Sequence, residues 1–217
     1  KQNNNTTTLA LQENGIYQGA INGILASNAS GTGLTNYAIT YVPGKLTIDK
    51  LNTVTWTGAG GDNNWSTAAN WTNNSTPVRS NVLNVVIPAG FTVNFDAIAA
   101  DNSNKPTSGI ANSSNLVFNL NTDFTLSNVI SGPGSINQQG SGTLTISGNN
   151  AAYTGNTLIN TSRLHLINAR AIGSGSIVSN GGGLSMDSSI ELPSLNVNGN
   201  LVLHSGIYTT GSQTYNG

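Results

Sequence analysis

The clearest guide to the architecture of this chain is the segment GSGTLTISGNNAAYTGNTLINTSRLHL, residues 140–166. Apolar residues alternate with polar ones in two places, at Leu144 and Ile146 and at Leu164 and Leu166. This period of two is typical of a β-strand with one buried face. Gly and Asn interrupt the alternating clusters, and both residue types tolerate the backbone conformations of tight corners. The segment therefore predicts very short strands separated by frequent corners.

The same pattern covers the second half of the chain. Its alternating apolar residues are Leu116, Phe118, Leu120, Phe124, Leu126, Leu158, Leu184, Met186, Leu195, Val197, Leu201 and Leu203. An antiparallel sandwich and a parallel β-helix both fit short strands, but the sandwich favours longer strands joined by hairpins. The abundant Asn favours the β-helix, because an amide can hydrogen-bond to equivalent amides in the coils above and below. The prediction is an all-β chain whose main part is a parallel β-helix.

The first half of the chain differs from this regular part. Residues 1–50 predict a small β-rich module that ends in a hairpin, with strands near 37–41 and 46–48 joined at Pro43-Gly44. Residues 51–95 contain all three Trp residues and predict an entry or cap segment. The β-helix is predicted over 96–217.

The composition excludes several classes of function. Only 7% of the 217 residues are charged and the net charge is −1, so no basic surface is available for nucleic acid. No apolar run approaches the roughly 20 residues needed to span a bilayer. No secretion leader opens the sequence, so the signal of an exported protein is expected to lie outside it. Cysteine is absent, which excludes a small disulfide scaffold.

Three segments resemble parts of large bacterial surface proteins. NYAITYVPGKLTIDK, residues 36–50, resembles the closing hairpin of MBG/YDG-type repeat modules. TWTGAGGDNNWSTAANW, residues 55–71, resembles a Trp-rich entry segment of autotransporter-like passengers. Residues 140–166 are similar to the autotransporter-associated β-strand repeat, through Gly-Thr-Leu-Thr-Ile at 142–146 and Tyr153-Thr154-Gly155.

This resemblance implies a right-handed parallel β-helix in the secreted part of an autotransporter or two-partner-secretion adhesin, at the surface of a Gram-negative bacterium. The expected function is structural: a non-enzymatic segment that mediates attachment, aggregation or filament formation. The expected partners are other copies of the chain, or glycans and proteins of a host or matrix surface. The chain is expected to be part of a longer polypeptide.

The residues that carry chemistry do not converge on an active site. The acidic residues are scattered, the two His are far apart, and no Ca²⁺-binding loop of the Asp-x-Asp-x-Asp-Gly type occurs. Glu191 and Asp187 adjoin apolar residues of alternating clusters, so they are expected to point into solvent. No catalytic residue, cofactor or metal site is predicted. A polysaccharide-cleaving β-helix enzyme remains an alternative function.

The Trp-rich segment supports two interpretations. Its candidate residues are Trp56, Trp65, Trp71, Asn63, Asn64 and Asn70. Exposed Trp rings beside Asn side chains would suit a carbohydrate-binding module, whereas buried Trp rings would close the open end of a β-helix and protect its strand edges. The structural cap is the favoured interpretation.

Self-association is the last prediction from the sequence. The hairpin side chains Tyr37, Ile39 and Tyr41 would supply an apolar contact if the hairpin added a strand to an exposed sheet edge of another copy. The low net charge offers little repulsion against such contact.

Overall fold

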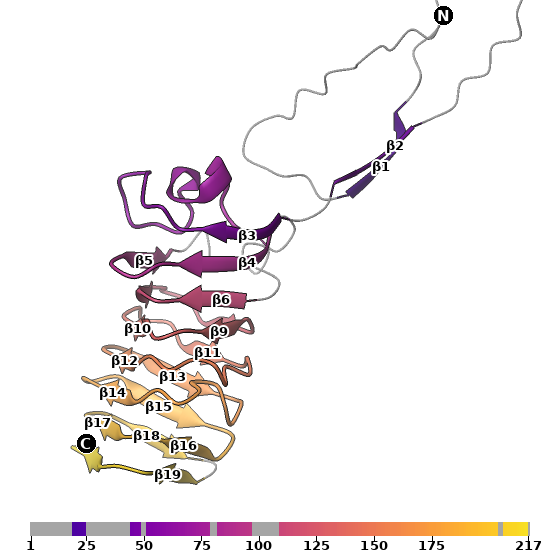
Figure 1. The fold of residues 1–217 in the computed structure, drawn as a ribbon. Coiled ribbons are helices and arrows are strands. Elements are labelled where there is room, and N and C mark those ends of the chain that lie inside the picture. Colours follow the sequence, from indigo (N-terminus) through magenta and orange to yellow (C-terminus); the bar gives the residue numbers. More distant parts are fainter. Residues whose placement is uncertain are drawn as a thin grey trace, which may run out of the picture.

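A computed structural model of the chain describes residues 19–24, 44–48, 51–78, 82–96, 109–203 and 206–216. The fold is nearly all β, with 47% strand and 4% helix. Apart from one antiparallel pair, the described strands pair in parallel and stack as a β-solenoid of about five turns (Figure 1). The predicted fold class, an all-β parallel β-helix, is confirmed.

Three faces form the walls of the solenoid. The first face is a seven-stranded sheet: β5 (Thr92–Phe95), β7 (Asn115–Phe118), β10 (Ser135–Gln138), β12 (Thr157–Ile159), β14 (Ile177–Ser179), β17 (Leu195–Val197) and β20 (Gln213–Tyr215). The second face has five strands: β8 (Phe124–Leu126), β11 (Leu144–Ile146), β13 (Arg163–Leu166), β15 (Gly183–Met186) and β18 (Leu201–Leu203). The third face has two separate sheets: β3 (Leu51–Thr55), β4 (Val82–Ile87), β6 (Gly109–Asn112) and β9 (Val129–Ser131), then β16 (Ile190–Leu192) and β19 (Ile207–Thr209).

Equivalent residues of successive coils lie directly above one another. On the second face, Leu144 pairs with Leu164, and Leu164 pairs with Leu184. These Leu residues face inward and form part of one continuous hydrophobic core. Of the alternating residues predicted to be inside, the following are buried: Leu144, Ile146, Leu164, Leu166, Leu184, Leu195 and Val197. Leu201, in the last coil of this face, is only partly buried.

The strand β12 shows one error of the sequence interpretation. Leu158 points outward and is only partly buried, whereas its neighbours Thr157 and Ile159 are buried. The reason is the register, which places Thr157 between Ile136 and Ile177. Stacking on those two inward residues fixes the orientation of β12.

Amide side chains line one corner of the solenoid, as the abundance of Asn predicted. The residue directly after each of β7, β10, β12, β14, β17 and β20 is Asn or Gln, and together these form the amide column: Asn119, Gln139, Asn160, Asn180, Asn198 and Asn216. The Asn180 amide donates to Asn160 Oδ1 at 2.8 Å, and Asn216 donates to Asn198 Oδ1 at 2.8 Å. The Asn160 amide donates to the neighbouring Asn137 Oδ1 at 2.7 Å. Amides thus link successive coils without introducing charge.

The β-helix begins earlier than predicted. β3 and β4 pair in parallel with each other and continue into β6, and β5 pairs in parallel with β7. Residues 51–55 and 82–95 are therefore coils of the solenoid rather than part of a separate entry segment. Only the connection between β3 and β4 forms a cap. Its short 3-10 helices are η2 (Ala68–Asn70) and η3 (Thr72–Asn74).

The N-terminal module contains one described strand pair. β1 (Gly19–Ile24) and β2 (Gly44–Ile48) are antiparallel, with Ile21 opposite Leu46. The predicted strand at 46–48 is thus present as β2, and its described partner is β1. The predicted strand at 37–41, with Tyr37, Ile39 and Tyr41, lies outside the described residues, as does the turn residue Pro43.

Candidate functional site

The three Trp side chains form an aromatic stack at the β3 end of the solenoid. The Trp71 ring lies edge-on to Trp56 and Trp65, with centroid distances of 5.0 and 4.7 Å. Trp65 then contacts Phe95 at 5.0 Å, and Phe95 contacts Phe118 at 5.1 Å. The stack therefore continues the hydrophobic core outward from the first coil.

The same segment covers the free edges of the first strands. Trp65 N donates to Asn94 O at 2.9 Å and Asn94 N donates to Asn63 O at 2.7 Å, so residues 63–65 pair with the outer edge of β5. Thr55 N of β3 donates to Thr72 Oγ1 at 2.9 Å. These bonds satisfy backbone groups that an uncovered edge would leave free for pairing with another chain.

Asp62 and Asn70 organise the polar part of the cap. Asp62 accepts hydrogen bonds from the Asn64 backbone, the Thr67 hydroxyl and the Asn70 amide, at 2.9, 2.8 and 2.8 Å. These bonds, above all the one from the Asn64 backbone, lower the pKa of Asp62 below its ordinary value of 3.8. Asn70 also accepts from Gly60 N at 2.9 Å and is completely buried. The connection between β3 and β4 is thus an ordered segment held together by hydrogen bonds to Asp62 and Asn70.

The Trp rings offer no open face to a ligand. Their exposed fractions are 1% for Trp56, 0% for Trp65 and 2% for Trp71. Stacking on a sugar requires an exposed aromatic face, so the glycan-contact interpretation does not fit these rings. Of the predicted Asn residues, Asn63 is exposed, Asn64 is partly buried, and Asn70 is buried inside the cap.

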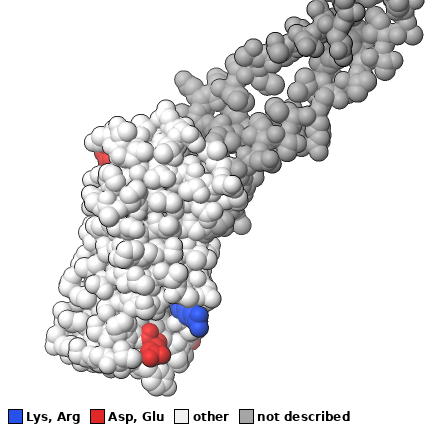
Figure 2. Space-filling model, viewed as in Figure 1, with Lys and Arg blue, Asp and Glu red and all other residues white. Residues whose placement is uncertain are grey.

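Four charged side chains of the described residues lie in two neighbouring coils near the C-terminal end, whereas Asp62, Asp96 and Asp123 lie in earlier parts of the chain. Arg163, Arg170, Asp187 and Glu191 all fall between residues 163 and 191 and are all exposed. Figure 2 shows a face with little charge: a blue and a red patch lie close together toward the end of the stack at which β19 lies, and a small red spot lies near the opposite end. These two coils therefore carry both basic and acidic side chains on their surface.

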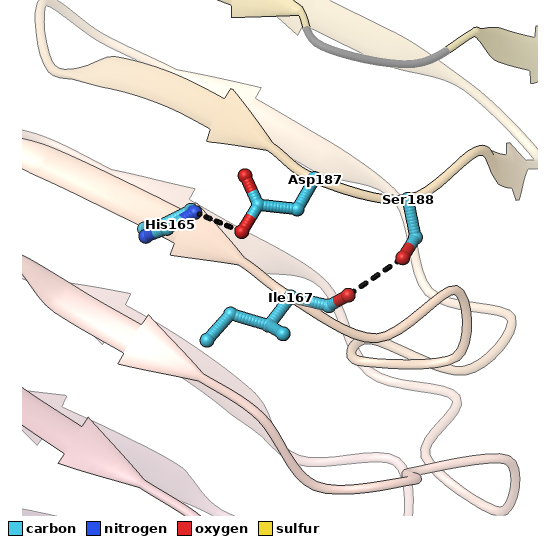
Figure 3. A network of polar contacts seen from close by, with 4 residues as sticks. All are labelled: His165, Ile167, Asp187 and Ser188. Atoms are coloured by element: carbon cyan, nitrogen blue, oxygen red, sulfur yellow. Dashed lines mark hydrogen bonds and ion pairs between the residues drawn. The ribbon is translucent and has the colours of Figure 1, made fainter.

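One ion pair lies on the outer surface of the second face. His165 Nε2 is 3.1 Å from Asp187 Oδ2, and the two side chains are 29% and 43% exposed (Figure 3). Nearby, the Ser188 hydroxyl donates to Ile167 O at 2.7 Å. An exposed pair of this kind contributes about 0–1 kcal/mol to stability.

A groove of about 500 Å³ opens on the third face. It lies where the third-face strands are interrupted between β9 and β16, because the intervening coils make turns at 151–152 and 169–174. Its lining includes Ala151, Ala169, Arg170, Glu191, Leu192 and Thr210. The small side chains leave space between the turn and β16.

Buried side chains replace the missing strand pairing behind this groove. Asn150 Oδ1 accepts from Ile130 N at 2.7 Å, and the Asn150 amide donates to Ala171 O at 2.5 Å. The Tyr153 hydroxyl accepts from Ile136 N at 3.1 Å and donates to Asn156 O at 2.9 Å. Burial raises the pKa of Tyr153 to about 12. The interrupted face is therefore held rigidly from inside.

The sequence interpretation missed this groove. It placed Glu191 outward, which the structure confirms, but it assigned that residue no role. Arg170 lies in a turn and Glu191 in a strand 21 positions later, and only the stacking of coils brings both to one hollow. The local clue was the break in strand alternation at 167–175.

Glu191 is the single carboxylate among the described residues that line the groove, whereas glycoside hydrolysis generally uses two carboxyl groups on opposite sides of the scissile bond. In the part of the chain that the structure describes, no three His, Asp or Glu side chains gather as ligands for a metal ion. None of its helices has the length and apolar character needed to cross a membrane.

Comparisons of the chain with models of known protein families, with curated proteins and with solved structures give no match. The fold and the cap define the class of protein as architectural: a parallel β-solenoid with an aromatic cap at the β3 end.

Proposed function

We propose that this chain is a structural, non-enzymatic segment of a secreted bacterial adhesin, displayed outside a Gram-negative cell. In this role the solenoid is a rigid shaft that holds binding surfaces away from the cell and takes part in attachment or aggregation. The partners are other copies of the chain, or glycans and proteins of a host or matrix surface. The resemblance of residues 140–166 to the autotransporter-associated repeat supports the family assignment.

The observation that carries the proposal is the uncharged, hydrogen-bonded wall of the solenoid. On the outside of the first face, Ser135 donates to Asn115 Oδ1 at 2.8 Å and Ser194 donates to Ser176 Oγ at 3.0 Å. The amide column continues the same chemistry along the adjacent corner. Such walls hold successive coils about 4.8 Å apart in register, as a rigid shaft requires.

An adhesion assay tests the proposal directly. Beads coated with the full chain are incubated with epithelial cells, immobilised matrix and uncoated plastic, and bead retention is counted against beads coated with albumin. The proposal expects retention well above the albumin control on at least one biological surface. Retention equal to that of albumin on all of them would contradict it.

A parallel assay tests the enzymatic alternative. The chain is incubated with a panel of neutral and acidic polysaccharides, with and without Ca²⁺, and new reducing ends are measured. The structural proposal expects no release above the buffer control. Sustained turnover of any polymer would overturn the non-enzymatic assignment.

A further inference from the structure

We propose that the groove on the third face, together with Tyr208 beside it, binds a neutral polysaccharide chain. This inference rests on the proposed function, because it names the surface and the ligand class through which the adhesin attaches. It moves carbohydrate recognition from the buried Trp residues to the C-terminal coils. Arg170, Glu191 and Tyr208 carry the recognition.

Tyr208 supplies the exposed aromatic face that the Trp residues lack. Its side chain is 66% exposed, the largest exposure among the large hydrophobic side chains of the described residues. It stands on β19 directly opposite Glu191 of β16. Neighbouring strands lie about 4.8 Å apart, so the two residues stand on adjacent coils at the same position of the third face. A Tyr side chain, which has an apolar ring face and a polar hydroxyl, is suited to a surface that contacts both a ligand and solvent.

Arg170 and Glu191 supply opposite hydrogen-bonding functions. A guanidinium only donates and a carboxylate only accepts. Among the described residues neither side chain takes part in an ion pair, and both line the groove. Each is therefore available to a ligand without breaking an existing bond. Adjacent sugar hydroxyls both donate and accept, and can bond to either group.

The charge balance selects a neutral chain over an acidic one. The groove lining carries one cation, Arg170, and one anion, Glu191. A uronic acid near Arg170 would also lie near Glu191, which repels it. The remaining lining is small or uncharged, with Thr210 and Ser174 adding hydroxyls. A neutral polymer meets both charged groups without such repulsion.

The shape of the hollow favours a chain rather than a single sugar. Its volume of about 500 Å³ lies within the range of small-molecule sites. It is an open groove, and Tyr208 lies one coil beyond Glu191 along the solenoid axis. Arg170, Glu191 and Tyr208 thus follow one another along the solenoid axis, as the contacts to a polymer of repeating units would.

Affinity electrophoresis of the full chain tests the inference. The protein is run through native gels containing hydroxyethylcellulose, galactomannan or, as the acidic polymer, alginate. The wild-type chain is expected to be retarded by at least one of the two neutral polymers. Tyr208→Ala and Glu191→Gln are each expected to weaken that retardation about tenfold, as the loss of a stacking contact or a charged hydrogen bond implies. Arg170→Ala is expected to act similarly.

Arg163→Ala is the matched control, because Arg163 is equally exposed but lies on the second face. It should leave retardation unchanged, and circular dichroism should show that all variants remain folded. The inference is overturned if neither neutral polymer retards the chain, if alginate alone does, or if the groove variants bind like the wild type. If these failures occur while coated beads still adhere, the adhesin proposal stands and only the groove assignment is lost.

Discussion

Replacing Gly155 with alanine is expected to destabilise the β-helix by about 2–4 kcal/mol. Gly155 is buried at the corner that leads into β12. A Cβ atom there would lie 1.9 Å from Gly134 O of the preceding coil, and one at Gly175 would lie 1.8 Å from Gly155 O. Both contacts are with backbone, so no side-chain rotation relieves them. The stacked positions of Gly155 and Gly175 permit only glycine, because successive coils approach each other so closely here.

The magnitude follows from the separation that the new methyl group requires. Reaching an ordinary contact of 3.4 Å would move the two coils apart by about 1.5 Å. The flanking bonds Ile136 N to Asn156 O and Thr154 N to Gly132 O are each 3.0 Å long, and that movement would break them. Each lost bond costs about 0.5–1.5 kcal/mol, and overpacking strain adds about 1–3 kcal/mol. Alanine offsets only about 0.4–1 kcal/mol of this loss of stability, because it lowers the conformational entropy of the unfolded chain.

Urea unfolding followed by far-UV circular dichroism measures the effect. Gly206→Ala is the matched control, because its new Cβ would meet the Tyr208 ring at 3.4 Å, an ordinary contact. The free energy of unfolding of Gly206→Ala should stay within about 1 kcal/mol of that of the wild type. If Gly155→Ala also stays within that margin, the reasoning from close coil packing is wrong.

Three further substitutions probe the core, the inner polar network and the cap. Leu164→Asp should cost several kcal/mol, since it places an unpaired charge in a core position of 0% exposure; a urea midpoint equal to that of the wild type would contradict it. Tyr153 prefers to stay protonated in the fold, because burial raises its pKa to about 12, so its stabilising contribution is complete below pH 10 and is lost as the pH rises through 12. In Tyr153→Phe, the unfolding midpoint measured between pH 9 and 12 should therefore not show this fall with rising pH. Asp62 has a lowered pKa, so it stabilises the cap above pH 3.8 and ceases to do so as the pH falls further. Tryptophan fluorescence should report this change in the wild type but not in Asp62→Asn.

The sequence predicts the β-helix well where apolar and polar residues alternate strictly. Leu164 and Leu166 flank a single polar residue, so only one face of β13 can be buried. Prediction fails where both faces carry apolar residues or where polar residues belong inside. β12 has Leu158 outside and Thr157 inside, and Gln138 of β10 is buried because its amide donates to Gly140 O and Gly142 O at the corner. In these strands, contacts with the neighbouring coils and corners determine which side chains face inward, rather than the sequence of the strand itself.

The candidate site was less predictable than the fold. The sequence pointed to Trp56, Trp65 and Trp71 as a cap, and their burial agrees with a structural role. It did not point to the groove, which arises from a break in the third face. Arg170 lies in a turn with no strand pattern, and its proximity to β16 depends on the lengths of the coils between them. A pattern within one coil contains no information about that distance.

In-register stacking explains why the charged residues of the groove can serve binding rather than stability. Two like charges one coil apart would repel by about 1 kcal/mol even in water, so a charged column would oppose stacking at every step. The amide column avoids this cost, and Arg163 is flanked in its own column by Thr143 and Gly183 rather than by another charge. Arg170 and Glu191 form no side-chain bond between coils in the described structure. Stacking does not require either side chain, so substituting them should change ligand binding while leaving the unfolding midpoint unchanged. A large loss of stability in Glu191→Gln would mean instead that the groove is part of the structural frame.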